Sequence, residues 1–238
     1  MAYTGSSSPT TAFGRPAVVD TRVAVFLRAV YGWMAAGLAI TALTASVIAR
    51  SPSIVTAIAT NRGLFWALAI AQLGVVFVLS ARVRQLAAST AAVLFVTYAA
   101  LTGVTLSFVL LVYTGESVAS TFIVAGSMFG ALALYGTTTR RNLSGVGQFM
   151  FMGLIGLVVA SLIGMFWHND GLQFMISLVG VVVFAGLTVW DAQRLKSMAL
   201  ATNTGGTSAY TIVGALALYL DFVNLFLFLL RFLGGRRR

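Results

Sequence analysis

The chain has 238 residues, of which 59% are hydrophobic and 8% are charged, and its formal net charge is +10. Soluble domains carry about 25% charged residues, so an ordinary soluble fold is excluded, and the basic residues form no segment long enough for a nucleic-acid-binding domain. The absence of cysteine excludes disulfides and thiolate metal sites, and the single His168 excludes a multi-histidine zinc site.

Residues 1–25 are rich in Ser, Thr, Pro and Gly and are predicted to form a mobile cytoplasmic tail. Apolar runs of about 20 residues, long enough to cross a bilayer as helices, fill residues 26–234. Polar breaks divide them into seven segments, at 28–49, 64–82, 87–112, 117–138, 146–167, 172–194 and 209–233. A basic tail, 235–238, follows. The sequence therefore predicts an all-α polytopic membrane protein with one domain of seven transmembrane helices.

The distribution of Lys and Arg predicts the orientation, because cytoplasmic loops carry an excess of both. With the N-terminus in the cytoplasm, the inner side holds nine basic residues: Arg15, Arg22, Arg28, Arg82, Arg84, Arg140, Arg141, Arg194 and Lys196. The outer side then holds Arg50 and Arg62 before the basic tail. Seven crossings place that basic tail outside, against the expected excess of basic residues in the cytoplasm. A last segment that enters the membrane and returns to the same side would keep the tail in the cytoplasm. We favour seven crossings because residues 209–233 are long enough to span.

Two of the five acidic residues, Asp191 and Asp221, lie in the last two apolar segments. A charge in a hydrocarbon span is costly, so an acid there needs a partner or a function. Each lies fifteen residues from Gly206, and both lie about 15 Å above the turn if the sixth helix continues past Arg194. Neighbouring carboxyls share a proton and titrate together, so their protonation state could set the separation of the two helices, which predicts a pH gate. Alternatively, each aspartate caps a water pocket or pairs separately with an arginine or a backbone group.

Three further residues are candidates for the same site. Arg82 ends the second segment on the side of Asp191, as a counter-charge to that aspartate or as a plain membrane anchor. Asn224 follows Asp221 by three residues on one helical face, where it donates to the carboxylate, lines a polar path or packs between helices. Gln72 lies in the middle of the second segment, where it forms an interhelical hydrogen bond or lines a pathway.

The sequence contains no nucleophile–base pair, phosphate-binding loop or HExxH motif, which predicts that the protein is not an enzyme and uses no cofactor. The spacing Gly126-x-x-x-Gly130 indicates close helix packing or a face for self-association. We expect a monomer or a weak homo-oligomer in the lipid bilayer.

The residues around both aspartates resemble the transmembrane Bax inhibitor motif family (Bax inhibitor and lifeguard proteins), specifically its bacterial members. The resemblance is carried by DAQRLK and ALYLDFVNLFLFLLRFLG in the last two segments, and by VYGWMAAGLAITAL, LTGVTLS and STFIVAGSMFGALALYGTTT in earlier ones. It implies seven helices, with the last one central and surrounded by the other six. It also implies a bacterial inner membrane location.

Members of this family are associated with a pH-sensitive calcium leak through a pair of aspartates on the last two helices, which match Asp191 and Asp221. Two acids imply weak, transient binding of Ca²⁺. An arginine at the end of the second helix is associated with latching the closed state, and Arg82 is the matching position, with Arg84 the near alternative. Some relatives carry an acid in the middle of the second helix, where this chain offers Gln72.

Two classes of function follow from the residues and the resemblance. The first is a pH-sensitive calcium leak channel gated by the intramembrane aspartates. The second is a regulatory interaction protein, because some bacterial relatives look like partners of a membrane-anchored quality-control protease, with residues 1–25 as a recognition tail. Leak should survive deletion of residues 1–20, whereas regulation of a partner should be lost.

Overall fold

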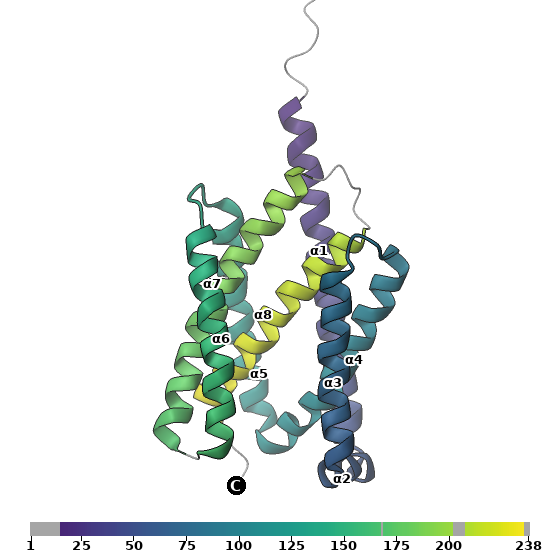
Figure 1. Cartoon of the computed structure of the whole chain (residues 1–238), viewed down its shortest axis with the longest axis vertical. Coiled ribbons are helices and arrows are strands. Elements are labelled where there is room, and N and C mark those ends of the chain that lie inside the picture. The colour runs from purple at the N-terminus through teal and green to yellow at the C-terminus, as the bar shows by residue number, and fades with distance from the viewer. Residues whose placement is uncertain (1–14, 168, 202–207, 236–238) are drawn as a thin grey trace, which may run out of the picture.

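The computed structural model describes residues 15–167, 169–201 and 208–235, which form a bundle of helices (Figure 1). The helices are α1 (Arg15–Ala49), α2 (Pro52–Thr60), α3 (Arg62–Ala81), α4 (Ala88–Val112), α5 (Gly115–Thr138), α6 (Ser144–Phe166), α7 (Asp170–Ala201) and α8 (Ala209–Leu233). Seven of these described helices, all except α2, are long and apolar enough to cross a membrane. The predicted seven-helix, all-α architecture is confirmed.

The polar breaks in the sequence mark where helices end and begin. At the starts of α3 and α5, the side chains of Asn61 and Thr114 accept hydrogen bonds from backbone N–H groups three residues further on. These are N-caps, which satisfy donors that the first helical turn leaves unpaired. In α7 the helix continues past Arg194 to Ala201, as the predicted equal depth of the two aspartates requires.

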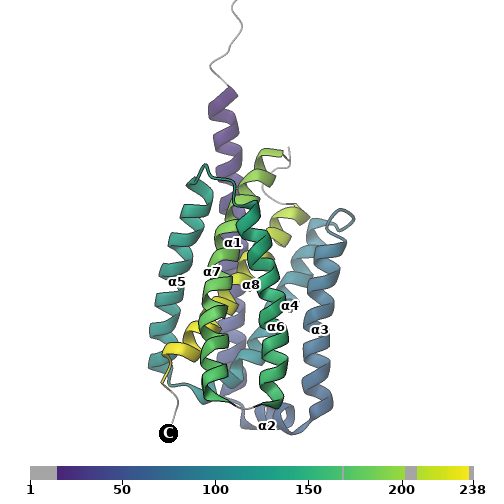
Figure 2. The ribbon, with the colours of Figure 1, turned by 60° about the vertical axis from the view of Figure 1, so that its left-hand side comes forward.

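The first helix begins earlier than the sequence predicts. Residues 15–25, predicted to belong to a mobile tail, form the start of α1, and this end of α1 extends beyond the other helices (Figures 1 and 2). Hydropathy misses this segment because a helix that continues outside the hydrocarbon layer needs no apolar run. The predicted tail residues 1–14 and 236–238, together with His168, lie outside the described part of the chain.

The short helix α2 was not predicted, because Ser51-Pro52-Ser53 indicates only a break. Pro52 occupies the beginning of the helix, where its missing N–H would be unpaired in any case. Figure 1 shows α2 at the end of the bundle opposite the start of α1. Its Ile58 is buried and anchors the helix to the bundle.

The centre of the bundle is α8. In its apolar window 67% of the residues are buried, against 44% for α7 and at most 33% for each of the other spans. It packs mainly against α1, α4, α5 and α7, while α3 packs on α4 and α6 packs on α7. Figure 1 shows α8 running obliquely between α5, α6 and α7 on one side and α3 and α4 on the other. The predicted central position of the last helix is therefore confirmed.

The course of α8 distinguishes crossing from re-entry. It starts at the end of the bundle from which α1 projects and finishes at the end where α2 lies (Figures 1 and 2). After it, the backbone N–H of Thr114, in the α4–α5 turn, donates to the carbonyl of Gly235, and the N–H of Gly235 donates to Ser117 Oγ. The seventh apolar segment thus runs the full length of the bundle.

Candidate functional site

Helices α7 and α8 bring the two intramembrane aspartates together. Asp191 lies ten residues before the end of α7 and Asp221 twelve residues after the start of α8, so their depths are about 15 Å and 18 Å. The two carboxyl groups interact across the contact between α7 and α8. Asp191 is 9% exposed and Asp221 is 4% exposed. Two acidic groups thus meet inside the bundle, at the seam between its two most buried helices.

The charges around this seam are unequal. Asp191 Oδ1 lies 3.7 Å from Arg194 Nη1, one turn further along α7, and the Arg194 guanidinium also lies over the ring of Trp190. Asp221 Oδ2 is buried and accepts no hydrogen bond from any donor in the described residues. A buried carboxylate without donors is costly, so the arrangement favours a proton held between the two carboxyls.

Arg82, the predicted latch, lies elsewhere. It caps the end of α3, its side chain is exposed, and it forms no ion pair with Asp191 among the residues that the structure covers. The position follows from the packing, because α3 lies on α4, away from α7. The counter-charge beside Asp191 is Arg194, and a latching role for Arg82 stays a prediction.

Asn224 does not use its amide on Asp221. Its Nδ2 donates to the carbonyl of Leu220 on the same helix, at 2.8 Å. The side chain lines a cavity between α6, α7 and α8. The predicted hydrogen bond from Asn224 to the carboxylate of Asp221 is therefore absent from the described structure.

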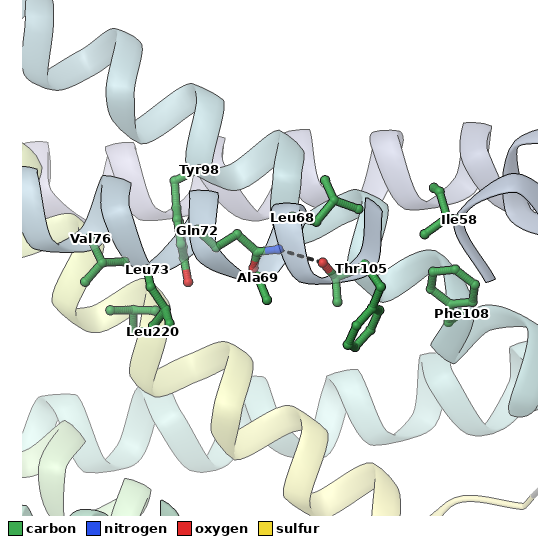
Figure 3. A pocket seen from close by; sticks show the side chains of 11 residues that line it. Ile58, Leu68, Ala69, Gln72, Leu73, Val76, Tyr98, Thr105, Phe108 and Leu220 are labelled. Atoms are coloured by element: carbon green, nitrogen blue, oxygen red, sulfur yellow. Dashed lines mark hydrogen bonds between the residues drawn. The ribbon is translucent and has the colours of Figure 1, made fainter. Parts of the chain in front are cut away.

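Gln72 forms the predicted interhelical hydrogen bond. Its Nε2 donates to Thr105 Oγ1 of α4 at 2.7 Å, as Figure 3 shows. The two residues line a cavity of about 490 Å³ between α3 and α4, which Leu220 of α8 also contacts. Apart from these two side chains and the Tyr98 hydroxyl, the lining is apolar. This cavity offers a cation few ligands.

A buried hydrogen-bonded cluster that the sequence did not reveal fixes α8 just before Asp221. The hydroxyl of Tyr219 lies 2.6 Å from Thr41 Oγ1 of α1, and Thr41 donates to the carbonyl of Ala99 in α4. Because the Thr41 hydroxyl donates its single hydrogen to the Ala99 carbonyl, the Tyr219 hydroxyl is the donor in the bond to Thr41. The Tyr219 ring packs edge-on against Phe95. The only signal in the sequence was the position of Tyr219 in the apolar part of α8, two residues before an intramembrane acid.

Replacing Tyr219 by phenylalanine is expected to destabilise the protein by about 0.5–1.5 kcal/mol, because one buried interhelical hydrogen bond is lost. The free energy of unfolding would be measured on the purified protein in detergent. In combination with Thr41→Val, the two losses should not add, since both remove the same bond. The matched control is Tyr135→Phe, at an exposed tyrosine of α5. An equal loss in that control would contradict the assignment.

The polar residues that follow Asp191 hold the loop between α5 and α6. Gln193 accepts a hydrogen bond from the N–H of Leu143 at 2.9 Å and donates to the carbonyl of Arg141 at 2.7 Å. Lys196 Nζ donates to the carbonyl of Thr137, at the end of α5. The run from Asp191 to Lys196 thus combines one acid of the site with fixed attachments to a neighbouring loop.

The carboxyl oxygens of Asp191 and Asp221 are too few to hold a metal ion tightly, so they favour transient over permanent binding of a cation. Ca²⁺ takes six to eight oxygen ligands, and two carboxyl groups supply at most four oxygens. Among the residues described, no group of three or more His, Asp or Glu side chains gathers to hold a metal. Any Ca²⁺ at Asp191 and Asp221 would therefore keep at least two water ligands.

Comparison with known proteins gives matches over most of the chain. The family profile described as "Inhibitor of apoptosis-promoting Bax1" matches residues 23–238. The inner membrane protein YbhL of Escherichia coli is 49% identical over 215 residues, which cover 89% of this chain and 92% of that protein. An uncharacterized protein of Borreliella burgdorferi is 42% identical over 214 residues, with coverages of 89% and 92%. YrjE of Lactococcus lactis is 38% identical over 211 residues, with coverages of 88% and 90%.

Proposed function

Because this chain belongs to the Bax inhibitor family, a family of membrane proteins, we propose that it is a pH-sensitive calcium leak channel of the bacterial inner membrane. The observation that carries the proposal is the meeting of Asp191 and Asp221 inside the bundle, each on one of the two most buried helices. The pair serves as pH sensor and as part of the ion pathway. The N-terminus faces the cytoplasm, as the basic residues indicate.

The gate works through charge. With one proton shared, the two carboxyls hold α7 and α8 together. Loss of that proton leaves two negative charges side by side, and unit charges about 4 Å apart repel by about 4 kcal/mol at an effective dielectric constant near 20. Either the helices separate or a cation enters to offset the repulsion. Both responses open the seam to a cation.

The surroundings of the pair suit transient passage of calcium. Among the described residues, Arg194 forms an ion pair with Asp191, and the Arg194 side chain is 57% exposed. Because the guanidinium is exposed, it can turn into solvent when a cation takes its place beside the buried carboxylate of Asp191. Asp191 is then free to receive a hydrated Ca²⁺, whose weak binding by two acids is appropriate to a leak.

The test is calcium flux through the purified full-length protein in liposomes, followed with a calcium-sensitive dye across a pH series. We expect flux above that of empty liposomes, rising as the pH is raised on the side of the bundle where α7 ends and α8 begins. Setting the pH separately inside and outside the liposomes identifies the responding side. Flux equal to that of empty liposomes at every pH would reject the proposal.

A further inference from the structure

A second site lies between α6, α7 and α8, where a cavity of about 560 Å³ has a polar edge and apolar walls. Its polar side chains come from three helices: Ser161 of α6, Gln173 of α7, and Asn224 and Arg231 of α8. The remaining lining is mostly leucine, valine and phenylalanine. The two aspartates do not line this cavity, so it is separate from the proposed gate.

Arg231 supplies an unneutralised positive charge to this cavity. Its Nη1 donates to Gln173 Oε1 at 3.4 Å, and its guanidinium lies 5.9 Å from the centre of the Phe228 ring. No acidic side chain lies within ion-pair distance of it among the described residues. Gln173 in turn donates to the carbonyl of Gly164, which holds its amide at the cavity. A guanidinium beside an oriented amide fits an anion and repels a calcium ion.

The placement of Arg231 along α8 sets the shape of the site. It lies two residues before the end of the helix, and Asn224 lies seven residues, or about 10 Å, deeper in the bundle. The charge therefore sits at the boundary of the apolar layer, while the walls at the depth of Asn224 are apolar side chains. A positive charge at the boundary and apolar walls further inside match the two parts of an anionic phospholipid, a charged headgroup and an apolar chain.

We propose that this cavity binds an anionic phospholipid, with the headgroup phosphate on Arg231 and Gln173 and an acyl chain between α6 and α8. Arg231 is exposed, so the phosphate reaches it from the bilayer. A free phosphate ion would satisfy the guanidinium but would leave the apolar walls unfilled. The apolar walls are thus the argument for a lipid over a soluble anion.

The experiment measures lipids retained by the purified full-length protein, by native mass spectrometry after titration with phosphatidylglycerol or phosphatidylcholine. We expect tighter retention of phosphatidylglycerol, weakened roughly tenfold in Arg231→Gln, which is what losing one charge-assisted hydrogen bond costs. Gln173→Leu, which keeps the charge, should weaken retention less. The matched control is Arg62→Gln, at an exposed arginine that begins α3 and does not line the cavity, and it should retain lipid normally.

Three results would overturn the proposal. One is unchanged retention of phosphatidylglycerol in Arg231→Gln. Another is an equal loss in Arg62→Gln, which would indicate general surface charge. The third concerns the source of the anion: protein in phosphatidylcholine would be titrated with inorganic phosphate, and thermal stabilisation as large as that given by phosphatidylglycerol would assign the site to a soluble anion.

Discussion

Calcium flux through an Asp221→Asn variant is expected to stay near the level of empty liposomes and to be independent of pH. Asparagine has the shape of a protonated aspartic acid and can donate a hydrogen bond to Asp191, so it holds α7 and α8 together at every pH. It also leaves one carboxylate at the seam, which halves the ligands available to a cation. The measurement is dye-detected flux across the pH series used for the unmodified protein.

The matched control for this variant is Asp170→Asn. Asp170 begins α7, the helix that carries Asp191, but its side chain is exposed and lies twenty-one residues away. Its replacement should leave the amount of flux and its pH dependence unchanged. A wild-type pH profile in Asp221→Asn, or the same loss in Asp170→Asn, would show that the buried pair is not the sensor.

Replacing Gly136 by leucine is expected to cost about 3 kcal/mol of stability or more, the upper end for overpacked cores. A Cβ atom at this position of α5 would contact the backbone carbonyl of Val189 and come within 3.0 Å of the Ala192 Cβ, both on α7. Backbone cannot rotate away as a side chain can, so α5 and α7 would have to separate next to Asp191. The measurement is thermal unfolding of the purified protein in detergent.

Gly130 provides the matched control on the same helix. A Cβ atom there would meet nothing within 4 Å, and leucine is a better helix former than glycine. Gly130→Leu should therefore leave stability unchanged or raise it slightly. If both substitutions destabilised the protein equally, the loss would come from α5 itself and not from its contact with α7.

Three glycines of α5 show which questions the spacing of small residues in a sequence does not answer. Gly126-x-x-x-Gly130 predicts a packing face, yet both positions face open space in the described structure, whereas Gly136 contacts α7. The spacing of small residues identifies a face that would allow close approach, but it does not say whether a neighbouring helix lies there. That depends on the arrangement of the whole bundle. A face for self-association at Gly126 and Gly130 stays a prediction.

The helices themselves were largely predictable, because a spanning segment must be apolar over about 20 residues and its ends need polar or flexible residues. The similar depth of Asp191 and Asp221, predicted as equal, followed from counting residues along the last two segments. The Asp191–Arg194 contact could have been predicted, since residues three apart share a helical face, although Arg82 was the predicted counter-charge. The Tyr219–Thr41 hydrogen bond could not have been predicted, because it joins residues 178 apart in the sequence.

The central position of α8 has a consequence for biosynthesis. This helix follows the other six spanning helices in the chain, so it leaves the ribosome after them. Chains generally fold from the N-terminus as they are made, and until α8 is inserted the others have no common element to pack around. The partly made protein must therefore persist in the bilayer without its centre. Completion of the core, including the aspartate pair, therefore waits for the insertion of α8.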